Sequence, residues 1–229
     1  MHPQRETMSG FADHLPLSQR GAFDESRVSG DWRPITAQCL LKLVDLLETV
    51  ELTAWEGRSL RAGWRVRDVV AELLWRCDSR LWELGIERVQ AAFRDPLTPD
   101  PDIIRLAAAA PSQLIELLRG LSTRRANRVG RRGIGDLSDV VSRSYEIARS
   151  CGRDLELPAV ATGAVCLARM LSAPLSIRAA ISGRSLEATD AGWAVGRGIA
   201  LRAPAEQHVL FLFGRWATLP GTRVGDSAE

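Results

Sequence analysis

Residues 62–73 read AGWRVRDVVAEL and begin an extended apolar periodicity. One apolar seam continues at helical spacing through Val66, Val70, Leu73, Cys77, Leu81 and Leu84. A second stripe, on the opposite side of the same helix, carries Glu72, Trp75, Ser79, Trp82 and Ile86. We therefore predict a helix over residues 66–93 that is covered on both sides, because a helix with two apolar faces must bury both.

Three further helices are predicted on either side of this one. Apolar residues at helical spacing predict a helix that begins near Pro34, a helical region over residues 102–127 and a helix closed by Gly152. Pro111 should kink or restart the second of these regions, since proline cannot donate the helical hydrogen bond. Four helices of this length predict an up-and-down four-helix bundle over residues 31–155.

The chain beyond Pro158 has a mixed pattern. We predict a helix over residues 159–170, strands at 175–181, 193–195 and 199–201, and a last, buried helix from Pro204 to Arg215. The predicted fold class is therefore α+β, with a small α/β domain over residues 156–222. The non-periodic residues 1–30 are expected to be a disordered leader, and residues 223–229 a tail.

Composition narrows the classes of function. The chain has 229 residues, of which 45% are hydrophobic and 25% charged, which is typical of a globular protein. A formal net charge of +2 argues against a nucleic-acid partner, and the lack of long apolar runs argues against a membrane partner and for the cytoplasm. The four cysteines are scattered, so we expect reduced core residues. The run of arginines from Arg124 to Arg132 is expected to be a solvated helix end and loop.

Three segments resemble the mycothiol-dependent maleylpyruvate isomerase family, part of the wider DinB-like group. Residues 62–73 are similar to its motif Gly-Trp-Thr-Val-Arg-Asp-Val-Val-Ala-His-Leu, and Leu52 and Trp55 loosely match the stretch before it. Residues 146–152, Glu-Ile-Ala-Arg-Ser-Cys-Gly, look like the family's Asp-Ile-Ala-Arg-Ala-Leu-Gly, and 213–215, Phe-Gly-Arg, contain its late Gly-Arg. The resemblance extends over residues 35–222. It implies a four-helix bundle that holds a divalent metal, with a C-terminal domain that closes over it and isomerisation or mycothiol transfer as the activity.

The metal-binding positions of that family are substituted here. Its first histidine ligand falls on Glu72, and its Glu-x-x-x-His pair falls on Asp139 and Arg143. A protonated guanidinium repels a metal ion, and the histidines of the chain, His2, His14 and His208, offer no replacement pair inside the bundle. The sequence therefore predicts neither a metal nor another cofactor.

The substituted positions suggest a different pocket. Asp139 and Arg143 are spaced i, i+4 and can pair, with Glu72 facing them, so that a guanidinium replaces the charge of the metal. We predict Glu72, Asp139 and Arg143 as catalytic residues, acting on an anionic or carbonyl-bearing molecule or through one carboxylate whose pKa burial raises. The predicted substrate-binding residues are Trp75, Trp82, Tyr145 and, from the resemblance, Arg215.

Three functions remain open at this stage. The first is a metal-independent relative that binds a small organic molecule and catalyses an isomerisation, cyclisation or addition, as a tailoring enzyme of actinobacterial type would. The second is a non-catalytic binding or scaffold protein, for which Asp139, Arg143, Glu146 and Ser150 are simply a solvated stripe. The third is a mycothiol S-transferase or isomerase with a non-standard metal site. The sequence does not indicate the oligomeric state.

Overall fold

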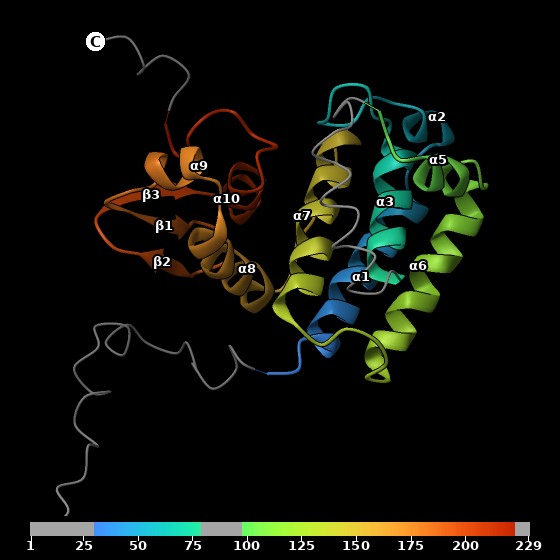
Figure 1. The fold of residues 1–229 in the computed structure, drawn as a ribbon, viewed down its shortest axis with the longest axis horizontal. Helices are drawn as coiled ribbons and strands as arrows, with labels where there is room; N and C mark the ends of the chain where they lie inside the picture. Colours follow the sequence, from blue (N-terminus) through green and yellow to red (C-terminus); the bar gives the residue numbers. More distant parts are fainter. Residues whose placement is uncertain (1–29, 79–97, 223–229) are drawn as a thin grey trace, which may run out of the picture. The chain divides into compact units, whose positions relative to one another are not determined.

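The computed structural model describes residues 30–78 and 98–222. These residues are mainly helical and include one three-stranded sheet, which confirms the predicted α+β class (Figure 1). The predicted leader and tail, the second half of the predicted helix 66–93, and Trp82 lie outside the described residues.

Four helices pack together before residue 155: α1 (Arg33–Glu48), α3 (Val66–Asp78), α6 (Pro111–Ala126) and α7 (Ile134–Ser150). Helix α1 packs against α6 and α7, and α3 packs against the same two helices (Figure 1). Each member of this four-helix group therefore has two neighbours within it. The apolar seams predicted for α1, α3 and α7 line the interior, which explains why they recur every three or four residues.

Proline sets two helix starts in this group. Pro34 lies in the first turn of α1, as predicted. Pro111 begins α6 and separates it from the short helix α5 (Pro101–Ala107), so the predicted region over residues 102–127 is two helices with a restart between them. Asp100 caps α5 by accepting a hydrogen bond from the backbone N–H of Asp102 at 2.9 Å. A further short helix, α2 (Leu52–Trp55), precedes α3 and buries Trp55.

The C-terminal part combines helices with the sheet. Its elements are α8 (Ala159–Ser172), α9 (Leu175–Ala180), β1 (Arg184–Ala188), β2 (Ala194–Gly196), β3 (Ile199–Ala203) and α10 (Ala205–Leu212). The strand order is β2-β1-β3, in which β1 pairs antiparallel with β2 and parallel with β3. Helices α8 and α10 pack against α7, and the indole N–H of Trp193 donates to the Thr162 hydroxyl at 2.8 Å.

The strand predicted at residues 175–181 is wrong, because this segment forms helix α9. The alternation of Leu175, Ile177, Ala179 and Ile181 favoured a strand, but only Ile181 is buried. Pro174 precedes the first turn and two alanines favour the helix. The strand β1 follows instead, after Gly183, whose positive φ of 67° allows the chain to turn.

The described residues from Asp31 onward belong to one compact unit, so the predicted division at residues 155/156 stays a prediction. Across residues 30–78 and 98–222, every helix is too short or too polar to span a bilayer.

Candidate functional site

Helices α3 and α7 bring Glu72, Asp139 and Arg143 together. The Nε and Nη2 atoms of Arg143 donate to the two carboxylate oxygens of Glu72 at 2.9 and 3.0 Å, and Nη1 donates to Asp139 Oδ1 at 3.0 Å. Arg143 is 8% exposed and Glu72 is 6% exposed, so this forked ion pair lies inside the protein. The three residues predicted as catalytic therefore form a single cluster, in which Glu72 and Arg143 are buried and Asp139 is half-buried, and their roles in catalysis stay predictions.

The charges in this cluster stabilise one another. Burial alone would raise the pKa of Glu72, but the guanidinium groups of Arg143 and Arg61 outweigh it and hold that pKa well below its usual range. Burial likewise lowers the pKa of Arg143, and the carboxylates of Glu72 and Asp139 more than reverse this. The expectation of a carboxylate whose pKa is raised by burial is therefore wrong for Glu72, which is held ionised.

Two residues that the sequence analysis did not assign to the site extend it toward the C-terminal part. Arg61, in the loop before α3, donates to Glu72 and also to both oxygens of Glu146 on α7, at 2.8 and 3.1 Å. Glu146 in turn accepts from Nε of Arg215 at 3.2 Å. The spacing of Glu146, seven residues after Asp139, places it on the same helix face and could have indicated this role.

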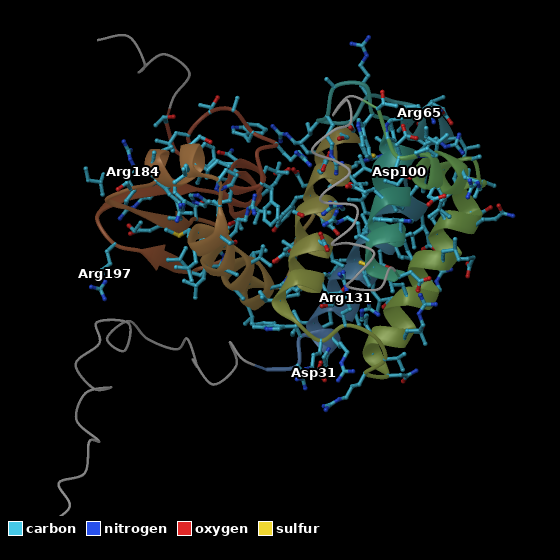
Figure 2. The ribbon with its side chains drawn as sticks, viewed as in Figure 1. Asp31, Arg65, Asp100, Arg131, Arg184 and Arg197 are labelled. Atoms are coloured by element: carbon cyan, nitrogen blue, oxygen red, sulfur yellow. The ribbon has the colours of Figure 1, made fainter. Side chains whose placement is uncertain are left out.

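The cluster also extends in the other direction along α7. Asp139 accepts from Arg76 at 3.0 Å and from Arg131 at 3.3 Å, and Asp136 accepts from Arg131 at 2.8 Å and from Arg125 at 2.6 Å. Arg125 also donates to the backbone carbonyl of Cys77 at 2.8 Å. The expectation of a fully solvated arginine run is therefore wrong for Arg125, which is buried. The position of Arg131 is labelled in Figure 2.

Together these contacts form a continuous arginine–carboxylate network along the α3–α7 interface. Its members within the described chain are Arg61, Arg76, Arg125, Arg131, Arg143, Arg215, Glu72, Asp136, Asp139 and Glu146. The six guanidinium groups outnumber the four carboxylates, which leaves an excess of two positive charges. Positive charge therefore predominates among the described members of the network.

These residues do not fit a divalent metal. Both oxygens of Glu72 already accept from guanidinium groups, and the permanent cation of Arg143 beside them would repel a metal ion. Within residues 30–78 and 98–222, no three His, Cys, Asp or Glu side chains are arranged to hold a metal. His208 is buried in α10, and its Nε2 lies 3.1 Å from the carbonyl oxygen of Glu187.

Of the predicted substrate-binding residues that the structure describes, Arg215 has a recorded contact with the network. Arg215 joins it through Glu146, with 29% of its side chain exposed. Trp75 is half-buried and packs against the core. Tyr145 is buried, and burial raises its pKa. The acidic groups that act on it are Asp190 and Glu206 of the C-terminal part rather than Glu72 of the network.

The cysteines are free thiols. Cys39, Cys77 and Cys166 are buried as predicted, whereas Cys151 is half-buried at the end of α7. Burial raises the pKa of all four, that of Cys39 to about 12. A thiol with a raised pKa carries little thiolate at neutral pH, so none of these residues has the properties of a nucleophile.

Comparison with known proteins shows two similar solved structures. They are the crystal structure of the mycothiol-dependent maleylpyruvate isomerase and that of its histidine-to-alanine mutant. Each is 14% identical in sequence and covers 80% of this chain and 88% of its own, with TM-scores of 0.48 and 0.47, respectively. No protein-family model matches the chain, and no curated protein matches its sequence. We draw no functional conclusion from a structural likeness of this degree.

Proposed function

We propose that this chain is a metal-independent, cytoplasmic protein with a DinB-like four-helix bundle that binds a small anionic organic molecule beside the arginine–carboxylate network. The observation that supports this proposal is the buried, forked pairing of Arg143 with Glu72 at 2.9 and 3.0 Å. A guanidinium supplies permanent positive charge without coordination chemistry. The resemblance of residues 62–73 to the isomerase family suggests that this position once held a ligand-binding centre.

Arg215 is the group best suited to contact such a molecule. Its Nε donates to Glu146, and 29% of its side chain is exposed. Burial and the neighbouring charge of Arg61 lower its pKa, which means that the cation is incompletely compensated. A carboxylate or phosphate group bound there would supply the missing negative charge with two parallel hydrogen bonds.

Any catalysis at this site would be electrostatic. Glu72 is held ionised, so it is unsuited to donate a proton near neutral pH. The arginines could instead stabilise negative charge that develops on a bound carbonyl compound. The saturation of Glu72 by Arg61 and Arg143 also favours the second candidate, a non-catalytic binding or scaffold protein in which the network only holds the helices together.

Calorimetric titration with malonate, maleate and inorganic phosphate tests ligand binding. We expect at least one anion to bind, and Arg215→Gln to weaken it by about tenfold or more, since a charge-assisted pair is lost. Arg105→Gln, at an exposed position of α5, is the matched control and should leave binding unchanged. If no anion binds, or if both variants bind as well as the parent, the scaffold function becomes the better explanation.

Metal analysis of the purified chain tests the remaining alternative. We expect far less than one zinc per chain, and an unchanged unfolding temperature after treatment with a chelator. A stoichiometric zinc that survives dialysis would instead support a metal-dependent S-transferase or isomerase, with ligands other than the three substituted positions.

A further inference from the structure

The most exposed apolar side chains of the C-terminal part come from three segments that lie near one another. Leu171, at the end of α8, is 76% exposed; Leu175, at the start of α9, is 75% exposed; and Ile199, at the start of β3, is 73% exposed. None of the residues of α9 is buried, although it carries Leu175 and Ile177. Single exposed apolar side chains are common on protein surfaces, whereas several close together often mark an interaction site.

Contacts within the fold show that these positions are close together. Met170, next to Leu171, packs against the backbone at Gly196 in β2, which brings the end of α8 to the β2–β3 turn. Ile199 pairs with Arg184 in the parallel register of β1 and β3. Gly198 lies against the carbonyl of Gly183, just beyond α9. The end of α8, the residues just beyond α9 and the β2–β3 turn are therefore neighbours in the fold.

The charged side chains of these segments are arginines. Arg178 lies in α9, and Arg184 and Arg197 lie at the same end of the sheet (Figure 2). None of the three pairs with a carboxylate among the described residues, whereas the arginines of the network all do. The carboxylate of β1, Glu187, is engaged by Arg202 at 3.0 Å. We call Leu171, Leu175, Arg178, Arg184, Arg197 and Ile199 the basic apolar end.

We propose that the basic apolar end binds the surface of an anionic lipid bilayer. Single apolar side chains can insert between lipid headgroups while arginines contact the phosphates, and this needs no complementary shape. Protein partners, by contrast, dock mainly through aromatic anchors that fill pockets, and this end exposes none of the Trp, Tyr or Phe residues of the described chain. A second copy joined end to end would bring the unpaired arginines of both copies together.

Membrane binding at the basic apolar end would be independent of the proposed ligand binding. Composition led us to expect no membrane partner because it excludes a spanning segment. A peripheral contact needs only a local group of apolar and basic side chains, which here come from three separate segments.

Vesicle flotation tests the proposal with the full chain. The probes are vesicles of phosphatidylcholine alone and of phosphatidylcholine mixed equally with phosphatidylglycerol. We expect the anionic vesicles to bind the chain at least about tenfold more than the neutral ones, and this preference to fall at high salt. Leu175→Ser and Arg197→Gln should each reduce binding by about fivefold or more.

Matched controls are available on the four-helix side of the chain. Leu52→Ser, at a position 72% exposed on α2, and Arg105→Gln should leave vesicle binding unchanged. All four variants alter exposed side chains, and thermal unfolding checks that each is folded. Equal binding to both vesicles, no binding to either, or equal losses in the control variants would overturn the proposal. Concentration-dependent dimerisation that Leu175→Ser abolishes would also overturn it, in favour of self-association.

Discussion

Arg143 shows how strongly a buried charge depends on its partners. Its three nitrogens donate to Glu72 and Asp139 inside the protein, where water cannot replace a lost hydrogen bond. The pair need not add stability relative to apolar residues of the same size, because desolvation offsets much of the attraction. Removal of one partner, however, leaves the other charge buried and uncompensated.

At this residue we predict that Arg143→Met lowers the free energy of unfolding by about 3–5 kcal/mol, measured by urea denaturation. The double variant Arg143→Met with Glu72→Gln should recover part of the loss, because the buried carboxylate is neutralised. Arg105→Met removes an exposed pair with Asp102 and should cost less than about 1 kcal/mol. Equal losses in the two single variants would contradict the buried role of Arg143.

Two glycines, one in α6 and one in the loop after it, differ in the backbone conformation and the space around them. Gly120 lies on the exposed side of this helix, and a methyl group built there meets no atom of the described residues within 4 Å. Gly130, in the loop after α6, has a φ of 95°, and a methyl group there would lie 2.0 Å from Nη1 of the buried Arg125. The two glycines therefore respond oppositely to the same substitution.

We predict that Gly120→Ala raises the free energy of unfolding by about 0.5–1 kcal/mol, since alanine lowers the entropy of the unfolded chain and favours the helix. Gly130→Ala should lower it by more than about 1 kcal/mol, because the left-handed backbone conformation is strained with a side chain present. Thermal or urea denaturation measures both changes. A destabilised Gly120→Ala variant would show that this side of α6 is covered by another part of the protein.

The stability of the whole molecule should depend on pH through buried groups in both of its parts. Burial lowers the pKa of His208 from its ordinary 6.5, although the hydrogen bond with the Glu187 carbonyl partly opposes this. The arginines lower the pKa of Glu72 from its ordinary 4.5. In both cases the unfolded chain binds protons at a higher pH than the folded one.

We therefore predict that stability is greatest above the ordinary histidine pKa, falls as the pH drops below about 6.5, and falls further below about 4.5 as Glu72 is protonated on unfolding. His208→Gln keeps a hydrogen-bonding group near Glu187 and should remove the first decline while keeping the second. Urea denaturation between about pH 7 and about pH 5 measures this slope. An identical slope in the variant would assign the first decline to another group.

Local sequence determined most of the helices. The seams of α1, α3 and α7 follow from side chains that repeat every three or four residues, and Pro111 restarts a helix through its own missing N–H. The permanent positive charge of Arg143 is likewise a property of residue identity. Helix α9 was mispredicted because seven residues of alternating pattern are too few to separate a strand from an exposed helix.

Tertiary structure alone decided which charges meet and which side chains stay uncovered. Arg61 pairs with Glu146 across 85 residues of sequence, and Arg215 reaches the same carboxylate across 69 residues. The basic apolar end also joins three segments through contacts that no periodicity records. Helical periodicity follows from local backbone geometry, whereas these contacts depend on how helices and strands pack, and packing is fixed by the whole core at once.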